Sequence, residues 1–251
     1  GQSNSAWGQT FNELRVGLQQ QRSERDSLSS QPFPALRVDL PDGTSLRLGT
    51  DSASQANGVD QDIVEVTDDL TWSRGRHLLT VGTHSEFFDF RNVFIPNLYG
   101  MYVFTNLANL GAGFAQGFSR TFSNTADPQQ AAQFRVRQLG FYAGDQWRAT
   151  PDLTITYGLR VDAPVFPDRP RANPLAQSGF GYATDVVPSP TMWSPRVGFN
   201  RAFGSAPRRR SQLRGGLGLF SGRTPYVWLS NQYAGTGLDF TLLTVAVSAN
   251  N

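Results

Sequence analysis

The chain has 251 residues and is poor in both hydrophobic and charged side chains, which make up 39% and 17% of it, against roughly 45 to 50% and about 25% in soluble domains. Its 25 glycines and 15 prolines interrupt helices throughout, which argues against a helical bundle. The net charge is +2, and three arginines stand together at 208–210. We interpret them as a solvated turn, because a nucleic-acid-binding surface needs a broader basic stripe.

The chain contains no apolar run of the roughly 20 residues that a membrane-spanning helix needs, and its mean hydropathy is −0.36. The sequence therefore excludes a helical membrane protein. Transmembrane barrels remain compatible with this hydropathy, because their strands alternate lipid-facing and lumen-facing side chains. Cysteine is absent, which also excludes disulfides and thiolate metal sites.

The first predicted strand covers residues 11–22, where every second residue from Leu14 to Leu18 is apolar. A hairpin follows over residues 59–90, with alternating apolar residues on both arms and a turn at residues 73–76. Both elements have one apolar and one polar face, as strands between two different environments do.

The clearest pattern lies at residues 153–162, where five apolar residues alternate with five polar or glycine residues. Residues 135–147 alternate in the same way and are joined to it through the proline-containing turn 149–152, which predicts a second hairpin. Asp145 interrupts the apolar face near that turn. We expect a lipid headgroup or water to hydrate it.

A third hairpin is predicted from residues 194–203 and 213–222 across the turn 204–212, and residues 238–247 are a candidate for a following strand. The total is about eight strands. Short connections near 74, 150 and 207 alternate strictly with long ones at 23–58, 91–133, 163–192 and 223–237. This alternation is typical of outer-membrane barrels, which have short periplasmic turns and long extracellular loops.

The predicted fold class is therefore all-β: an antiparallel transmembrane β-barrel fragment of about eight long strands in up-and-down hairpins. Six side chains are expected to face the lumen: Thr154, Thr156, Arg160, Asp162, Arg196 and Arg214. Six aromatic residues near the strand ends are expected to form the girdles at the membrane boundaries: Trp72, Trp147, Phe203, Phe87, Phe90 and Trp193. The alternative is that the aromatics form the core of a soluble β-sandwich.

The same segments resemble the barrel of TonB-dependent outer-membrane transporters, in particular the Oar-like branch. The matching phrases recur in order along the chain: Gln61–Ile63, Asp68–Trp72, His77–Phe88, Phe141–Tyr142, Asp145–Trp147, Leu153–Thr154, Tyr157–Arg160, Ser194–Phe199 and Arg214–Phe220. The resemblance implies a barrel of about 22 strands closed by a plug domain. It also implies a TonB complex that supplies energy for the uptake of a ligand.

Residues 1–251 are expected to be a partial barrel domain of this kind, without the plug, the N-terminal region and the C-terminal strands. Such a segment cannot close into a small barrel, because its strands have the tilt of a wide cylinder. We therefore expect an open, curved sheet with both edges free.

No catalytic or metal site is predicted. His77 and His84 are the only histidines, and their odd spacing places them on opposite faces of one strand. Adjacent Asp68 and Asp69 also point in opposite directions, which is unsuitable for a shared-proton pair. The glycines at 215–218 lack the pattern of a dinucleotide-binding loop. The chain is therefore expected to be no enzyme and to bind no cofactor.

The function expected from the sequence is that of a structural part of a transporter barrel in the bacterial outer membrane, mediating uptake of an unidentified ligand. The expected partners are outer-membrane lipid, the plug domain, the TonB complex and that ligand, with no nucleic acid. Two alternatives remain open. One is a cell-surface β-sandwich that binds glycans or acts as an adhesin, and the other is a passive porin-type barrel.

Overall fold

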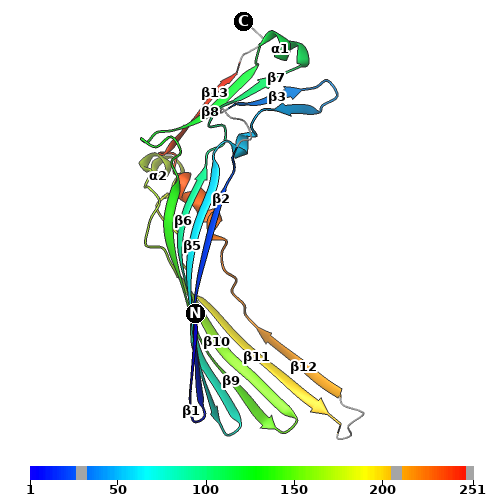
Figure 1. The fold of residues 1–251 in the computed structure, drawn as a ribbon, viewed down its shortest axis with the longest axis vertical. Helices are drawn as coiled ribbons and strands as arrows, with labels where there is room; N and C mark the ends of the chain where they lie inside the picture. The colour runs from blue at the N-terminus through cyan, green and yellow to red at the C-terminus, as the bar shows by residue number, and fades with distance from the viewer. Residues whose placement is uncertain (27–32, 205–210, 247–251) are drawn as a thin grey trace.

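A computed structural model describes residues 1–26, 33–204 and 211–246 of the chain. Eight strands form one antiparallel sheet in the order β1-β2-β5-β6-β9-β10-β11-β12, which is long, curved and open (Figure 1). Among the described residues, the edge strands β1 and β12 each pair on one side only, so the predicted open sheet is confirmed. The strand bounds are β1 Gln2–Trp7, β2 Thr10–Glu24, β5 Asn57–Arg74, β6 His77–Phe94, β9 Ala132–Thr150, β10 Leu153–Val165, β11 Met192–Phe203 and β12 Ser211–Gly218.

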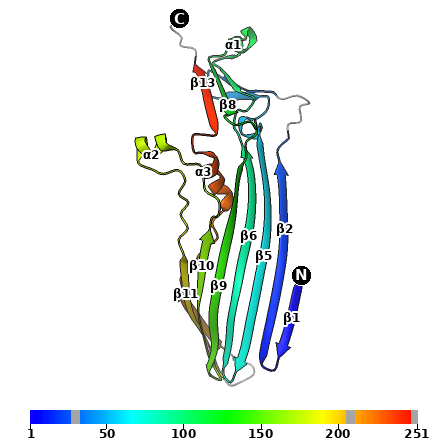
Figure 2. The same cartoon turned by 90° about the vertical axis from the view of Figure 1, so that its left-hand side faces the viewer.

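A second sheet of five strands lies beyond one end of the first sheet, the end opposite the short hairpin turns (Figures 1 and 2). The long connections emerge from this end. Its order is β13-β8-β7-β3-β4, in which only β3 and β7 are parallel. Its strands are β3 Ala35–Asp39, β4 Ser45–Leu48, β7 Met101–Phe104, β8 Gly117–Ser123 and β13 Phe240–Ala246. The helical segments are η1 Ser52–Ser54, α1 Leu107–Ala112, α2 Pro174–Phe180, η2 Tyr226–Leu229 and α3 Ser230–Ala234.

The predicted strands and hairpins of the first sheet are present, although the strand predicted at 213–222 ends at Gly218. The connections expected at 23–58 and 91–133 contain β3, β4, β7 and β8 of the second sheet, which the alternation did not predict. Two further expectations need correction. The predicted strand 238–247 does not follow β12 in the sheet; it is β13, which pairs with β8 in the second sheet. The eighth strand is instead β1, which the sequence analysis missed. Alternation predicts a strand but not its partner, and β1 is too short and polar to show a pattern. The arginines at 208–210 lie outside the described residues.

The hairpin turns are tight and staggered in one direction. Gly8 and Gly75 open two of them with φ of 61° and 62°, a conformation that favours glycine. In three places the turn of one hairpin accepts a hydrogen bond from the following strand, near the end of that strand. The turn residues Gln9, Arg76 and Asp152 accept with their carbonyl oxygens from the backbone N of Ser73, Arg148 and Ala202, respectively. This progressive offset is what tilted barrel strands require.

The two faces of the first sheet differ in polarity. We call the face that carries Leu159 the outer face and the face that carries Arg160 the inner face. The part of β10 from Ile155 to Val165 is about 33 Å long, measured along the strand. For a strand tilt near 40° this length spans about 25 Å along the barrel axis, which matches the height of the apolar band of an outer-membrane barrel. Most outer side chains at these levels are apolar: Val64, Val66, Leu70, Val81, Leu139, Phe141, Ala143, Val161 and Val197.

Asp145 is one polar exception on the outer face, and it has protein partners. Its Oδ2 lies 2.6 Å from His77 Nδ1 and accepts a hydrogen bond from the Tyr157 hydroxyl at 2.8 Å. The His77 ring stacks parallel to Trp147, with 5.8 Å between the ring centroids. Only 4% of Asp145 is exposed, and His77 and Tyr157, not a headgroup, bind its Oδ2, while its Oδ1 is buried with no hydrogen-bond partner among the described residues.

The two faces of β10 give a direct stability test. Leu159→Arg should destabilise the folded protein by about 2 to 4 kcal/mol, because Leu159 lies near the middle of the apolar band, where a charge is least tolerated. Thr156→Arg on the inner face should cost much less, and Ile155→Arg, close to the short turn, an intermediate amount. Folding titrations of the full-length protein in lipid measure all three, and equal penalties would contradict the assignment of the faces.

Candidate functional site

The six residues predicted to face the lumen all lie on the inner face. Thr154, Thr156, Arg160 and Asp162 alternate along β10, and the strand register aligns them with the residues of β11 and β12. Gly158 pairs with Arg196, and Thr154 pairs with Asn200, which in turn pairs with Arg214. The structure thus brings the six residues onto one continuous surface.

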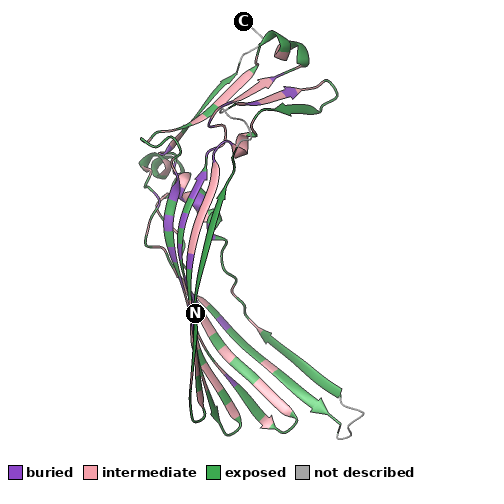
Figure 3. Ribbon diagram, in the orientation of Figure 1, coloured by how far each residue is buried: buried purple, intermediate pink, exposed green. Residues whose placement is uncertain are grey.

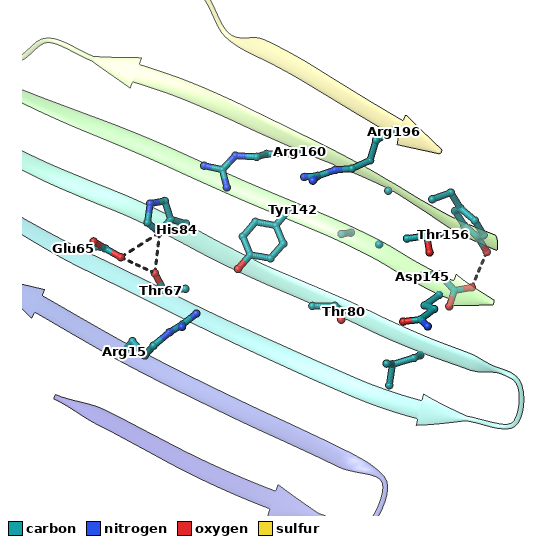
Figure 4. A pocket seen from close by; sticks show the side chains of 16 residues that line it. Arg15, Glu65, Thr67, Thr80, His84, Tyr142, Asp145, Thr156, Arg160 and Arg196 are labelled. Atoms are coloured by element: carbon teal, nitrogen blue, oxygen red, sulfur yellow. Dashed lines mark hydrogen bonds and ion pairs between the residues drawn. The ribbon is translucent and has the colours of Figure 1, made fainter. Parts of the chain in front are cut away.

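An open hollow of about 640 Å³ lies on this face across β2 to β11 (Figure 4). Its side chains come from strands far apart in the sequence: Arg15 from β2, Thr67 from β5, Thr80 and His84 from β6, Tyr142 from β9, and Thr156, Arg160 and Arg196 from β10 and β11. Most of them are polar or charged. The hollow is therefore suited to water and polar solutes.

Glycines shape the floor of the hollow. A Cβ at Gly82 would lie 2.7 Å from the Tyr142 ring, so only a bare backbone lets this ring lie against β6. Gly144 and Gly158 face each other on β9 and β10, and a Cβ at Gly158 would lie 2.8 Å from the carbonyl oxygen of Ala143. The aromatic ring covers one of these bare positions, as rings do in curved barrel sheets.

Charged groups around the hollow are partly paired. Arg160 donates to both oxygens of Asp162, with Nη2 to Oδ1 at 2.7 Å and Nε to Oδ2 at 2.9 Å, and its guanidinium lies 5.8 Å from the Tyr142 ring. On the opposite side Asp69 accepts hydrogen bonds from the Tyr142 hydroxyl and from Arg15. Arg196 has no acidic side chain within 4.0 Å among the described residues.

The two histidines lie on opposite faces, as their spacing predicted. His84 Nδ1 lies 2.9 Å from the Thr67 hydroxyl on the inner face, while His77 contacts Asp145 on the outer face. Within the part of the chain that the structure describes, no three histidine, aspartate or glutamate side chains are placed to hold a metal ion.

A family model described as an outer membrane beta-barrel domain matches residues 2–249. The chain belongs to this family. It is therefore a barrel-type protein of the bacterial outer membrane, and its long strands cross the bilayer. Comparisons with curated proteins and with solved structures found no match. In the described ranges, none of the helices has the length and apolarity to span a membrane.

Above the hollow, the inner face of the barrel sheet becomes apolar and aromatic. Phe88, Phe90, Phe134 and Val136 are at most 4% exposed there, and η2 and α3 cover them. Figure 3 shows this concentration of buried residues in the upper part of the sheet. The covering contacts include Phe134 and Tyr233, whose rings stack with centroids 4.3 Å apart.

Phe90 is the one predicted girdle residue that the structure contradicts. It is 2% exposed on the inner face and stacks on Phe134 with 5.2 Å between centroids, so it belongs to this core and not to a lipid boundary. Phe87, three residues earlier in the same strand, points to the outer face, because side chains an odd number of residues apart in a strand lie on opposite faces. The other predicted girdle residues are 36% to 61% exposed on the outer face, where their role stays a prediction: Trp72, Trp147, Phe203, Phe87 and Trp193.

Polar contacts fix η2 and α3 on the barrel wall. The Tyr226 hydroxyl donates to Gln138, and burial raises the pKa of this phenol to about 12, which keeps it protonated. Asn92 donates to Ser230 Oγ at 2.6 Å, and the Tyr233 hydroxyl donates to the carbonyl oxygen of Asp168 at 2.7 Å. These segments follow no periodic sequence pattern, so the sequence analysis missed them.

Asp168 connects the loop after β10 to this wall. Its carboxylate accepts hydrogen bonds from the backbone N, Nε and Nη2 of Arg135 at 2.8 to 3.0 Å, and the Arg135 guanidinium lowers the pKa of Asp168. The ion pair between Asp168 and Arg135 therefore stabilises the folded state when the pH lies above the usual carboxyl pKa. This stabilisation is lost as the pH falls through the lowered pKa of Asp168 in the folded protein.

The aromatic core predicts how η2 and α3 are held. Phe134→Ala should remove about 3 to 5 kcal/mol of packing, because the side chain is buried between Phe90 and Tyr233. Backbone amides of residues 226–234 should then exchange faster with deuterium in the full-length protein. Phe141→Ala, on the outer face of the same strand, is the matched control and should leave their exchange unchanged. Unchanged exchange in Phe134→Ala would show that other contacts hold the segment.

Proposed function

We propose that the chain forms part of the barrel of a TonB-dependent outer-membrane transporter that takes up an unidentified ligand. The observation that carries the proposal is the width of the sheet. Eight strands, six of them at least 12 residues long, form a curved sheet and leave both edge strands, β1 and β12, without a second partner among the described residues. A wide barrel uses such a sheet as one sector of its wall.

The inner face supports a wide barrel for a second reason. Small eight-stranded barrels fill their interior with side chains. Here Gly144, Gly158 and Gly198 leave the wall bare, and an open hollow remains beside Arg196. A large lumen, closed by a separate domain, accommodates this surface better than a narrow one.

The resemblance to TonB-dependent transporters adds the energetic and binding partners to this proposal. The outer face meets lipid, a plug domain occupies the lumen, and a TonB complex in the inner membrane drives uptake. The chain acts as scaffold and conduit, without catalysis, cofactor or nucleic acid. Several polar groups described above have structural partners, such as Asp162 for Arg160 and Asp145 for His77.

A passive porin-type barrel is the competing function, and the polar inner face fits it as well. The two differ in conductance, because a plugged transporter is closed at rest whereas a porin is open. A soluble glycan-binding or adhesin sandwich has less support, since β2 to β12 form a single layer with an apolar outer face.

Planar bilayers containing the full-length protein test the choice. We expect no steady ion conductance at rest, and we expect the full-length protein to bind the isolated periplasmic domain of TonB in a pull-down from detergent solution. Steady ohmic conductance together with no TonB binding would contradict the proposal and favour a porin. A passive porin of the same outer membrane serves as the open control.

A further inference from the structure

After Gly218 the chain leaves the sheet and crosses the inner face. We call residues 219–224 the crossing segment. It starts where Leu219 N donates to Pro195 O of β11 at 2.9 Å. It ends next to η2, which is docked on β6 and β9. The segment therefore spans the wall from β11 to β6.

Side-chain contacts between the crossing segment and the wall are polar. Ser221 Oγ donates to Asp162 Oδ2 of β10 at 2.8 Å and lies 3.0 Å from Ser194 Oγ of β11. Arg223 Nη1 donates to Glu86 Oε1 of β6 at 2.7 Å, and its guanidinium lies over the Phe88 ring. These contacts hold it at two points along its length.

The crossing segment lies directly above the hollow. Asp162 and Glu86, which bind it, are each two residues along their strands from Arg160 and His84, which line the hollow. Residues two apart in a strand share a face and are about 6.6 Å apart. With a plug domain in the lumen, as proposed above, a solute that moves along the wall from the long connections towards the short turns passes this segment before it reaches the hollow.

The segment differs from η2 and α3 in how it is held. Phe220 is 79% exposed and Leu219 is 64% exposed, so neither side chain packs into the wall. In contrast, Tyr226 and Tyr233 are 4% and 7% exposed within the aromatic core. Polar bonds at an exposed segment exchange readily for bonds to water, whereas undocking the two tyrosines would expose aromatic surface.

We propose that residues 219–224 are a gate at the upper rim of the hollow, held against the wall in this structure, which opens when Ser221 leaves Asp162 and Arg223 leaves Glu86 while η2 and α3 remain docked. A Cβ at Gly222 would meet no other atom within 4 Å, and the bare glycine backbone gives the segment conformational freedom. This inference rests on the proposed transport function for what passes the gate, but gate opening itself can be measured without a transported ligand.

Cysteine pairs in the full-length protein test the gate. Ser194→Cys with Ser221→Cys places two thiols where hydroxyl oxygens lie 3.0 Å apart, close enough for a disulfide after slight adjustment. Thr80→Cys, inside the hollow, serves as the reporter and is labelled with a membrane-impermeant maleimide added to intact cells. Because the reduced thiols at 194 and 221 also react with maleimide, labelling is measured by mass spectrometry on the peptide that contains position 80. We expect labelling of this peptide when the pair is reduced, loss of labelling after oxidation, and recovery after the disulfide is reduced and the reductant is washed away.

The matched control locks the part that is expected to stay docked. Asn92→Cys with Ser230→Cys, closed by a short bis-methanethiosulfonate cross-linker, joins α3 to β6 at a contact of 2.6 Å. Because the cross-linker also reacts with the reporter thiol, it is added in limiting amount, and labelling is scored only in cross-linked molecules whose position 80 carries no linker. Reporter labelling in these molecules should be unaffected. A variant with Ser221→Cys alone controls for oxidation of single thiols.

Three outcomes would overturn the gate. Labelling that persists when 194 and 221 are joined shows a permanently open route, and no labelling in the reduced protein shows a fixed barrier. Loss of labelling when 92 and 230 are joined shows that α3 and not the crossing segment moves. None of these depends on TonB binding or resting conductance, so a failure of the gate is distinguishable from a failure of the proposed transport function.

Discussion

The hydrogen bonding of the backbone in hydrocarbon is the constraint on which the rest of the structure depends. Each N–H and C=O group inside the bilayer needs a partner from the protein, because lipid tails offer none. Antiparallel pairing of β5, β6 and β9 over 14 to 18 residue pairs meets this demand. The stagger of the hairpins follows from the same pairing, since each turn bonds to the next strand before that strand ends. Tilt and curvature are thus set by the register.

Polar groups on the outer face show how the same constraint applies to side chains. Asp145 lies in the lower part of the apolar band, where an unpaired carboxylate would be costly. His77 and Tyr157, from the two neighbouring strands, both bind its Oδ2. Strand pairing delivers these partners because Asp145 pairs with Leu79, two residues from His77 on the same face, and directly with Tyr157. The three-strand cluster therefore supplies hydrogen bonds to Oδ2, while Oδ1 is buried with no hydrogen-bond partner among the described residues.

The inner face changes character along its length, and this change organises the candidate site. Its lower part is polar and open around Arg160 and Arg196, while its upper part carries the aromatic core of Phe88, Phe90 and Phe134. An aromatic surface in a watery lumen needs a cover, and η2 with α3 supplies it. Because η2 and α3 are docked on this core, the chain after β12 leaves the sheet edge and runs across the inner face. Its residues 219–224 pass above the hollow.

The sequence by itself predicted seven of the eight strands of the first sheet, their hairpins and their two faces, because period-two alternation and turn residues act locally along the chain. For that reason the six residues predicted to face the lumen, from Thr154 to Arg214, could be placed on one face, and the structure has all six on it. Only the tertiary structure decided where β13 pairs, which side chains bind Asp145, and that Phe90 is buried under Tyr226 and Tyr233. These depend on contacts between residues up to about 140 positions apart, and alternation fixes which way a side chain points but not what it meets there.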